Sequence, residues 1–593
     1  MDKRLERILP RVQKPARYVG GEYNAVLKDK AQVDTRIAFC FPDTYEIGMS
    51  NLGMRILYGV MNGMDGVWCE RVFAPWGDME EEMRKADMPL FALESGDPIT
   101  DFDIVAFSVG YEMAFPAILN MLDLARIPLH ASERTGLSPL VIAGGTAMYN
   151  AEPMADFIDL VSLGEGEDLT VELVELYRTA RREGWSKQQL LRAAAQLDGV
   201  YVPSLYDVTY HDDGTVAAIT PLDGAPAKVT KRIVHDMDKS YFPVKTIVPS
   251  TEIVQDRVTL ELFRGCIRGC RFCQAGYVYR PVRNRSRDLC ADYCVRSCDD
   301  TGYQEVTLSS LSTSDYPPLT GLCDELEPFC DQRHVSLSLP SLRADNFSME
   351  LMQRLAKGRK TGLTFAPEAG TQRLRDVINK NLTEDEILTT CANAFSGGWN
   401  NVKLYFMLGL PTETDEDVLG IAELVYKVIL TWKEHAVNKK RGLRVHVATA
   451  YFVPKPHTPF QWEPQITLEQ VRERVQYLRD AFRAEKCLKL RWHEPEMSFL
   501  EGVLSRADRR IADVVEKAYR RGAIFASWMD HFSIDPWLES LAECGLTAEE
   551  FTGARELDAP LPWDHLNAGV SREFLLRERR RAFEGKISED CRY

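Results

Sequence analysis

The sequence predicts an α/β protein in which a Rossmann-like domain precedes a second α/β unit of barrel type and a mainly helical C-terminal region. Short apolar runs alternate with helix-length stretches over residues 35–180 and again over residues 251–460, which predicts the two α/β units. After residue 460, Glu, Arg and Leu recur at helical spacing, which predicts the helices. The length of 593 residues exceeds what one hydrophobic core supports and agrees with several domains.

Composition and charge exclude several functional classes. The chain is 45% hydrophobic and 27% charged and has no apolar run of the ~18 residues that cross a membrane, so we expect no membrane partner. Its start lacks the apolar core of a secretion signal, which indicates a cytoplasmic protein. The formal net charge of −16 disfavours broad binding to nucleic-acid phosphates but leaves room for a local basic patch.

The pattern divides the chain into five segments: an N-terminal extension (1–34), the Rossmann-like domain (35–180), a connector (181–250), the barrel unit (251–500) and the helical region (501–593). The connector contains the hairpin signal Asp212-Asp213-Gly214, so we expect a small β element there.

Small or acidic residues follow the apolar runs of the Rossmann-like domain. They are Asp43, Ser108, Gly144, Gly145 and the run Gly164-Glu165-Gly166-Glu167. Because the carboxyl ends of parallel strands share one edge of a sheet, we expect these residues to surround a ligand crevice.

The cysteines indicate local chemistry, because eight of the fourteen lie between residues 266 and 330. The predicted strand VTLELFRG leads directly into Cys266, Cys270 and Cys273. A structural zinc site uses four protein ligands, usually in CxxC pairs, whereas three thiolates on one loop suit a [4Fe-4S] cluster with one open iron. The alternatives are a zinc knuckle completed by a distant ligand, and cysteines that merely pack in a core.

Two neighbouring features leave alternatives open. Cys290, Cys294 and Cys298 would share one helix face, either as core residues or as ligands of a second cluster. Seven arginines around the cysteine loop form either a solvated loop or an anion-binding rim: Arg264, Arg268, Arg271, Arg280, Arg283, Arg285 and Arg287.

The pattern CxxxCxΦC, with Phe272 before the last cysteine, resembles the cluster motif of the radical SAM superfamily. The resemblance implies that the open iron binds the amino and carboxylate groups of S-adenosylmethionine and that Phe272 lies near the adenine. One electron, from a donor such as a flavodoxin or ferredoxin, would then cleave this cofactor reductively to methionine and the 5'-deoxyadenosyl radical.

Residues 250–500 also resemble the methylthiotransferase-like branch of that superfamily, which implies a partial (β/α)6 TIM-like barrel. By this resemblance Ser309 and Glu368 follow strands that line the cofactor site, and Ser338 and Arg343 face the ribose and amino group. Lys380 stands where an arginine commonly pairs with the cofactor's carboxylate, and a lysine supplies the charge without the two-pronged contact. The acidic residues of GLPTETDED belong either to the same site or to a helix N-terminal cap.

A Rossmann-like domain ahead of such a barrel resembles the cobalamin-binding arrangement of several radical SAM subfamilies. In cobalamin proteins with a histidine ligand the first loop reads DxHxxG. This chain keeps Asp43 and Gly48 at that spacing but has Tyr45 in the histidine position. Cobalamin would therefore bind without a histidine ligand, held by residues 108–112, 144–146 and 164–167. The alternative is a vestigial or substrate-docking domain.

The whole chain is similar to an uncharacterised family of cobalamin-domain radical SAM proteins whose members are sometimes fused to a further domain. This implies a separate partner protein that supplies that domain. We expect a radical SAM enzyme that modifies an unknown substrate, by methylation or methylthiolation. A non-catalytic iron-sulfur binding or electron-transfer protein is the alternative.

Overall fold

The computed structural model describes residues 2–339 and 363–590. The N-terminal domain is built on a six-stranded sheet in the order β2-β1-β3-β4-β5-β6. Its strands are β1 (Thr35–Phe41), β2 (Val67–Phe73), β3 (Ile104–Ser108), β4 (Leu140–Gly144), β5 (Leu160–Ser162) and β6 (Val200–Tyr201). The first five are parallel and β6 is antiparallel, so the sheet extends past residue 180. Because the strand order reverses between β1 and β3, a ligand crevice is expected at their carboxyl ends.

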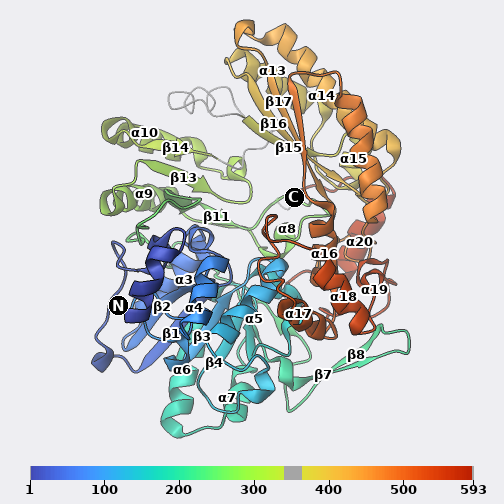
Figure 1. The fold of residues 1–593 in the computed structure, drawn as a ribbon. Helices are drawn as coiled ribbons and strands as arrows, with labels where there is room; N and C mark the ends of the chain where they lie inside the picture. The colour runs from blue at the N-terminus through green and yellow to red at the C-terminus, as the bar shows by residue number, and fades with distance from the viewer. Residues whose placement is uncertain (1, 340–362, 591–593) are drawn as a thin grey trace.

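Helices cover both faces of this sheet. Helix α3 (Leu52–Asn62) lies beside α6 (Gly166–Glu183) on one face. On the other face α4 (Gly77–Lys85) contacts α5 (Phe115–Leu124) through an ion pair between Arg84 and Asp123. The predicted Rossmann-like architecture is thus present (Figure 1).

The second α/β unit consists of two parallel half-sheets, β10-β13-β14 and β15-β16-β17-β18. The strands are β10 (Val258–Glu261), β13 (Glu305–Ser309), β14 (Ser336–Ser338), β15 (Leu363–Glu368), β16 (Asn401–Leu408), β17 (Arg444–Tyr451) and β18 (Leu488–Trp492). Between them run α9 (Arg287–Thr301), α10 (Leu319–Arg333), α13 (Glu384–Ser396), α14 (Asp415–His435) and α15 (Leu468–Phe482). The six predicted strands are confirmed, and β18 is a seventh that the pattern did not predict.

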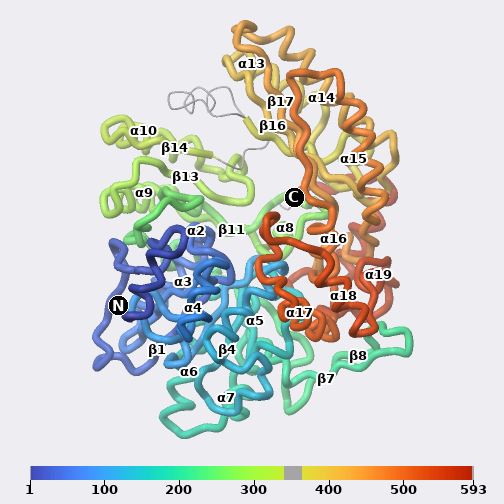
Figure 2. Tube along the Cα trace, in the orientation of Figure 1, coloured from blue at the N-terminus to red at the C-terminus, as the bar shows by residue number. Residues whose placement is uncertain are grey.

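The C-terminal region is helical, as predicted, and packs on the N-terminal domain. It contains α16 (Pro495–Arg506), α17 (Ile511–Arg520), α18 (Asp535–Glu543), α19 (Ala548–Thr552) and α20 (Arg572–Phe583). Leu500, Val503 and Val515 belong to the same hydrophobic core as the Rossmann-like sheet. Helix α17 lies beside α5 (Figure 2), so the C-terminal region and the N-terminal domain form one unit.

The connector forms the predicted hairpin, with β7 (Tyr206–Tyr210) antiparallel to β8 (Val216–Pro221). Gly214 in its turn has a φ of 82°, a conformation that favours glycine. In the part of the chain that the structure covers, no helix combines the length and hydropathy needed to cross a membrane.

Candidate functional site

The three motif cysteines lie on one loop that is closed at its base by a short antiparallel pair. Strand β11 (Phe263–Arg264) precedes Cys266 and pairs with β12 (Arg283–Asn284), which follows α8 (Ala275–Val278). Burial raises the pKa of the Cys273 thiol to about 12, and the neighbouring Cys270 and Cys266 add to this effect. The structure therefore brings the three thiols together.

This donor set fits a [4Fe-4S] cluster. Three half-buried thiols on a single loop can each bind a different iron and leave the fourth open. Deprotonation of such buried thiols is supplied by metal binding itself. Within residues 2–339 and 363–590, no three His, Cys, Asp or Glu side chains converge closely enough to hold a single metal ion.

Three predicted cofactor residues meet beside this loop. Lys380 Nζ lies 3.1 Å from Glu368 Oε1 and 6.0 Å from the centre of the Phe272 ring. Glu368 ends β15 in the left-handed region, with a φ of 68°, where the pairing with β16 shifts register. A glutamate held in this uncommon conformation is typical of a functional site.

The other predicted barrel residues do not lie with this group. Ser309 ends β13 and lines the cavity described below. Ser338 is half-buried in β14, opposite Thr307 of β13. Arg343 lies outside the described residues. The acidic run after β16 proves to be a helix cap, because Thr414 and Asp417 form the capping box of α14.

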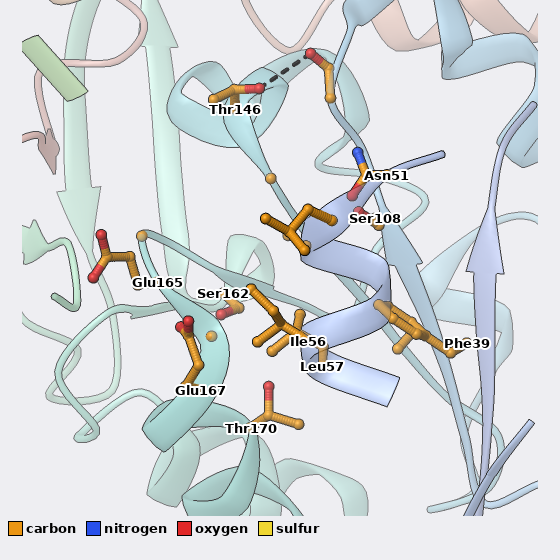
Figure 3. A pocket seen from close by; sticks show the side chains of 18 of the residues that line it. Phe39, Asn51, Ile56, Leu57, Ser108, Thr146, Ser162, Glu165, Glu167 and Thr170 are labelled. Carbon is orange, nitrogen blue, oxygen red and sulfur yellow. Dashed lines mark hydrogen bonds between the residues drawn. The ribbon is translucent and has the colours of Figure 1, made fainter. Parts of the chain in front are cut away.

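A cavity of 510 Å³ extends from the N-terminal domain to the barrel, and we call it the interdomain cavity. Its inner part is apolar and lies between the sheet and helices α3 and α6, lined by Ile37, Met61, Ile104, Leu173 and Val174. Its outer part is lined by strand-end residues of the N-terminal domain, including Ser108 and Ser162 (Figure 3). The barrel closes it with Phe263, Arg264, Gly265, Tyr279, Ser309 and Ser310. Gly265 immediately precedes Cys266, so the cavity reaches the cysteine loop.

Most of the predicted strand-end residues meet in this cavity: Ser108, Gly144, Gly145, Gly164 and Glu165. Gly145 has a φ of 114°, and a Cβ there would lie 2.4 Å from Val109 O. The Thr146 hydroxyl donates a hydrogen bond of 3.1 Å to Gly110 O, which joins two of these loops (Figure 3). Close-packed glycines such as Gly145 therefore form part of the wall of the outer cavity.

The first loop, in contrast, does not line the cavity. Tyr45 is buried and donates a hydrogen bond of 2.8 Å to Glu22 Oε1. Asp43 accepts a hydrogen bond of 2.8 Å from Trp528 Nε1, and Gly48 packs tightly against Phe73. Asp43, Tyr45 and Gly48 therefore lie outside the interdomain cavity, and their assignment to cofactor binding stays a prediction.

The arginines around the cysteine loop form neither a solvated loop nor an open rim. Arg271 is fully buried and donates to the Glu578 carboxylate and to carbonyls of Val377 and Lys586. Arg264 and Arg283 pair with Glu167 and Glu165, which joins the barrel to the cavity wall. Internal carboxylates and carbonyls thus satisfy most of this charge.

On the barrel side of the cavity the sequence analysis named Ser309 and Arg264 but did not single out Glu261 or Tyr279. Glu261 and Arg264 are 2.9 Å apart and border it, as does Tyr279. Glu261 is the last residue of β10, and this position was the available signal, since ligands bind at strand ends. The cysteines Cys290, Cys294 and Cys298 of α9 are buried in the core of the first half-barrel.

Comparisons with known proteins agree with this two-domain arrangement. The family model described as "Radical SAM proteins, N-terminal" matches residues 53–203, and that of the radical SAM superfamily matches residues 260–425. An uncharacterized protein of Methanocaldococcus jannaschii is 25% identical over 521 residues, which cover 86% of this chain and 97% of that protein.

Two solved structures are similar at lower identity. The methyltransferase TsrM from Kitasatospora setae, solved with cobalamin and a [4Fe-4S] cluster, is 13% identical with a TM-score of 0.44, covering 70% of this chain and 72% of that one. The cobalamin-dependent enzyme OxsB, solved with aqua-cobalamin and S-adenosylmethionine, is 11% identical with a TM-score of 0.43, covering 93% and 79%. From the two family models, which match its N-terminal domain and its cysteine-bearing barrel in turn, this chain belongs to the radical SAM superfamily.

Proposed function

We propose that the protein is a cobalamin-binding radical SAM enzyme that methylates its substrate. One observation carries the proposal: a single cavity is lined by Ser108 and Gly145 of the N-terminal domain and by Gly265, next to Cys266, of the barrel. A cofactor in this cavity would meet the cysteine loop without leaving the protein interior.

In this proposal Cys266, Cys270 and Cys273 hold the [4Fe-4S] cluster. When bound, the cluster supplies the electron that cleaves S-adenosylmethionine reductively. The Lys380 ammonium, 3.1 Å from Glu368, provides a positive charge for the carboxylate of S-adenosylmethionine. Phe272 offers an apolar ring beside it. Burial of this region would exclude water from a reactive radical.

The interdomain cavity has the chemistry that cobalamin requires. Its apolar inner part suits the benzimidazole of the nucleotide tail, and its outer hydroxyls and backbone groups suit the ribose and amides. None of the described residues lining it is a histidine, which fits binding without a histidine ligand. Bound cobalamin would supply a methyl carrier.

If cobalamin does not bind, methylthiolation is the remaining group transfer. A non-catalytic iron-sulfur or electron-transfer protein is the rival from another class. We also propose an electron donor such as a flavodoxin or ferredoxin, and a separate partner that supplies the domain fused in relatives.

The first test is anaerobic incubation of the reconstituted protein with S-adenosylmethionine and dithionite, followed by measurement of 5'-deoxyadenosine. We expect product from the wild type and none from Cys270→Ala. The matched control Cys544→Ala, at the C-terminal end of α18, should retain it. A fully loaded wild-type cluster without product would favour the electron-transfer protein.

The cobalamin assignment has its own test. A Cβ at Gly110 meets nothing within 4 Å and points to open space, so Gly110→Leu should fill the cavity without disturbing the fold. We expect this variant to lose retained hydroxocobalamin on gel filtration, whereas Gly77→Leu, which lies outside the cavity, should retain it. Absence of retention by the wild type would exclude cobalamin.

A further inference from the structure

One face of the second half-barrel carries an unusual concentration of positive charge. Helices α13, α14 and α15 cover the other face of β15-β16-β17-β18 (Figure 1), against buried residues such as Val402 and Val445. Because successive side chains of a strand alternate between faces, the face opposite these helices presents the intervening residues. We call its five basic residues the basic face: Lys403, Arg444, His446, Lys489 and Arg491.

The strand pairing places these residues side by side. Lys403 pairs with His446, and His446 pairs with Lys489, so the three form a row across β16, β17 and β18. Arg444 precedes His446 by two residues, and Arg491 follows Lys489 by two. With strands about 4.8 Å apart and about 3.3 Å per residue, the basic face extends roughly 10 Å across the strands and roughly 13 Å along them.

The positive charge of the basic face is not neutralised locally. Among the residues that the structure describes, no carboxylate forms an ion pair with Lys403, Arg444, Lys489 or Arg491. Burial lowers the pKa of His446, and the next causes are the charges of Arg491, Lys489, Lys403 and Arg444. Four clustered cations that pair with no described carboxylate are notable in a chain with a net charge of −16.

The same face contains an aromatic ring beside the cations. Lys403 Nζ lies 4.5 Å from the centre of the Tyr405 ring. Tyr405 pairs with Ala448 in β17, and Ala448 pairs with Arg491 in β18, so a small side chain separates the ring from a guanidinium. An aromatic ring framed by cations is the combination with which proteins bind the bases and phosphates of single strands.

Strand β16 connects the basic face to the reaction centre. Lys403, Tyr405 and Met407 follow one another on the same face. Met407 and Phe272 pack against one hydrophobic cluster beside the cysteine loop. Met407 follows Lys403 by four residues, about 13 Å along the strand, so a chain bound at the basic face could place its next unit near the cofactor.

We propose that the basic face binds the phosphates of a nucleic-acid strand, which is the substrate of the enzyme. The part concerning substrate rests on the function proposed above. Several separated cations favour a polymer with repeated phosphates over a substrate with one phosphate, which a single cation pair would hold.

The test is fluorescence anisotropy of the reconstituted full-length protein with labelled single-stranded RNA and DNA of equal length. The variant Lys403→Gln/Lys489→Gln/Arg491→Gln removes three charges from the basic face. The control Lys439→Gln/Lys440→Gln/Arg441→Gln removes three exposed charges from η12 (Lys439–Arg441). We expect at least ten-fold weaker binding from the first variant, with a salt dependence reduced by about two units of log K against log[salt], and wild-type binding from the control.

Equal loss from both variants, or no salt-dependent binding by the wild type, would overturn the proposal. Displacement of the strand by stoichiometric inorganic phosphate would also overturn it, in favour of a single-phosphate site. The variants leave Phe272 and Lys380 in place, so 5'-deoxyadenosine formation separates the two proposals. Product without strand binding removes only this inference, whereas strand binding without product removes the enzymatic function.

Discussion

Lys380 Nζ and Glu368 Oε1 lie 3.1 Å apart and join the end of β15 to the segment that follows α12 (Gln372–Val377). Both side chains are largely buried, and the charge of Lys380 also acts on Cys273. The lysine therefore stands between a carboxylate of the protein and the place proposed for the carboxylate of S-adenosylmethionine. An ammonium with three donors can serve both.

Replacement of this lysine should affect cofactor binding more than cluster binding. We expect Lys380→Gln to raise the KM for S-adenosylmethionine at least ten-fold, since a charge-assisted hydrogen bond contributes roughly 1.5–3 kcal/mol. Iron content should not change, because the cysteines are intact. Lys380→Arg, which keeps the charge, should stay close to the wild type. Rates of 5'-deoxyadenosine formation against cofactor concentration measure this, and an unchanged KM for Lys380→Gln would remove the assigned role.

Gly145, in the wall of the interdomain cavity, gives a second prediction. Gly145 has a φ of 114°, and an added Cβ would lie 2.4 Å from Val109 O. We expect Gly145→Ala to destabilise the fold by roughly 1–3 kcal/mol, because side chains rarely adopt this conformation. Gly110→Ala, which meets nothing within 4 Å, is the control and should unfold with the wild type. Urea unfolding followed by circular dichroism compares them, and equal midpoints would contradict the assigned strain.

Particular residues show how much of the fold can be predicted from the sequence. The first six barrel strands are apolar runs bounded by turns, and this pattern is sufficient to predict them. Strand β18, with the sequence LKLRW, is short and bears two cations, so it blends into the helical charge pattern around it. The basic face was not predicted from the sequence either. Lys403 and Lys489 come near each other only because β16 and β18 both pair with β17.

The candidate site, too, could be predicted only where the signal is local in the sequence. The spacing of the three cysteines on one loop is local, and it predicted their neighbourhood. The spacing of Asp43, Tyr45 and Gly48 is also local, but it does not fix the direction of their side chains. That direction depends on Glu22, Phe73 and Trp528, of which Trp528 is 485 residues from Asp43. Likewise, only the folded chain places Glu578 beside Arg271.

The buried Arg271 yields a third prediction. Its guanidinium holds the cysteine loop to α20 and to the segment after it, with donors to Glu578 Oε2 at 3.2 Å and Lys586 O at 2.8 Å. We expect Arg271→Leu to cost about 3–5 kcal/mol, because it removes the buried guanidinium from the Glu578 carboxylate and leaves that carboxylate only the Ser588 hydroxyl and the more distant Arg577. The exposed Arg580→Leu on the same helix should be neutral.

Cluster content separates a local effect of Arg271 from general instability. Since Arg271 lies between Cys270 and Cys273, the variant should bind less iron and sulfide per chain even at a temperature where it remains folded. Colorimetric iron and sulfide assays beside circular dichroism measure both properties. Full iron content in a folded Arg271→Leu protein would show that the loop does not depend on this contact.

His457 gives a prediction on pH. It is buried at the junction of barrel and N-terminal domain, with Nε2 2.8 Å from Tyr149 O, so the neutral ring donates to this carbonyl. Burial lowers the pKa of His457 to about 4, from an ordinary value of 6.5. Between these values the unfolded chain takes up a proton that the folded chain does not. The resulting stability is fully present above pH 6.5 and is lost as the pH falls towards 4, roughly 3 kcal/mol in total.

Replacing His457 should flatten this dependence. Its φ of 61° is tolerated by asparagine, so His457→Asn removes the titration without imposing backbone strain. We expect the free energy of unfolding to fall by roughly 3 kcal/mol less between pH 7 and pH 4 in this variant than in the wild type. His435→Asn is the matched control and should keep the wild-type slope, because the His435 side chain is 47% exposed. Parallel curves for wild type and His457→Asn would mean that the interdomain junction accepts the proton, and acid sensitivity would then have to arise from other groups.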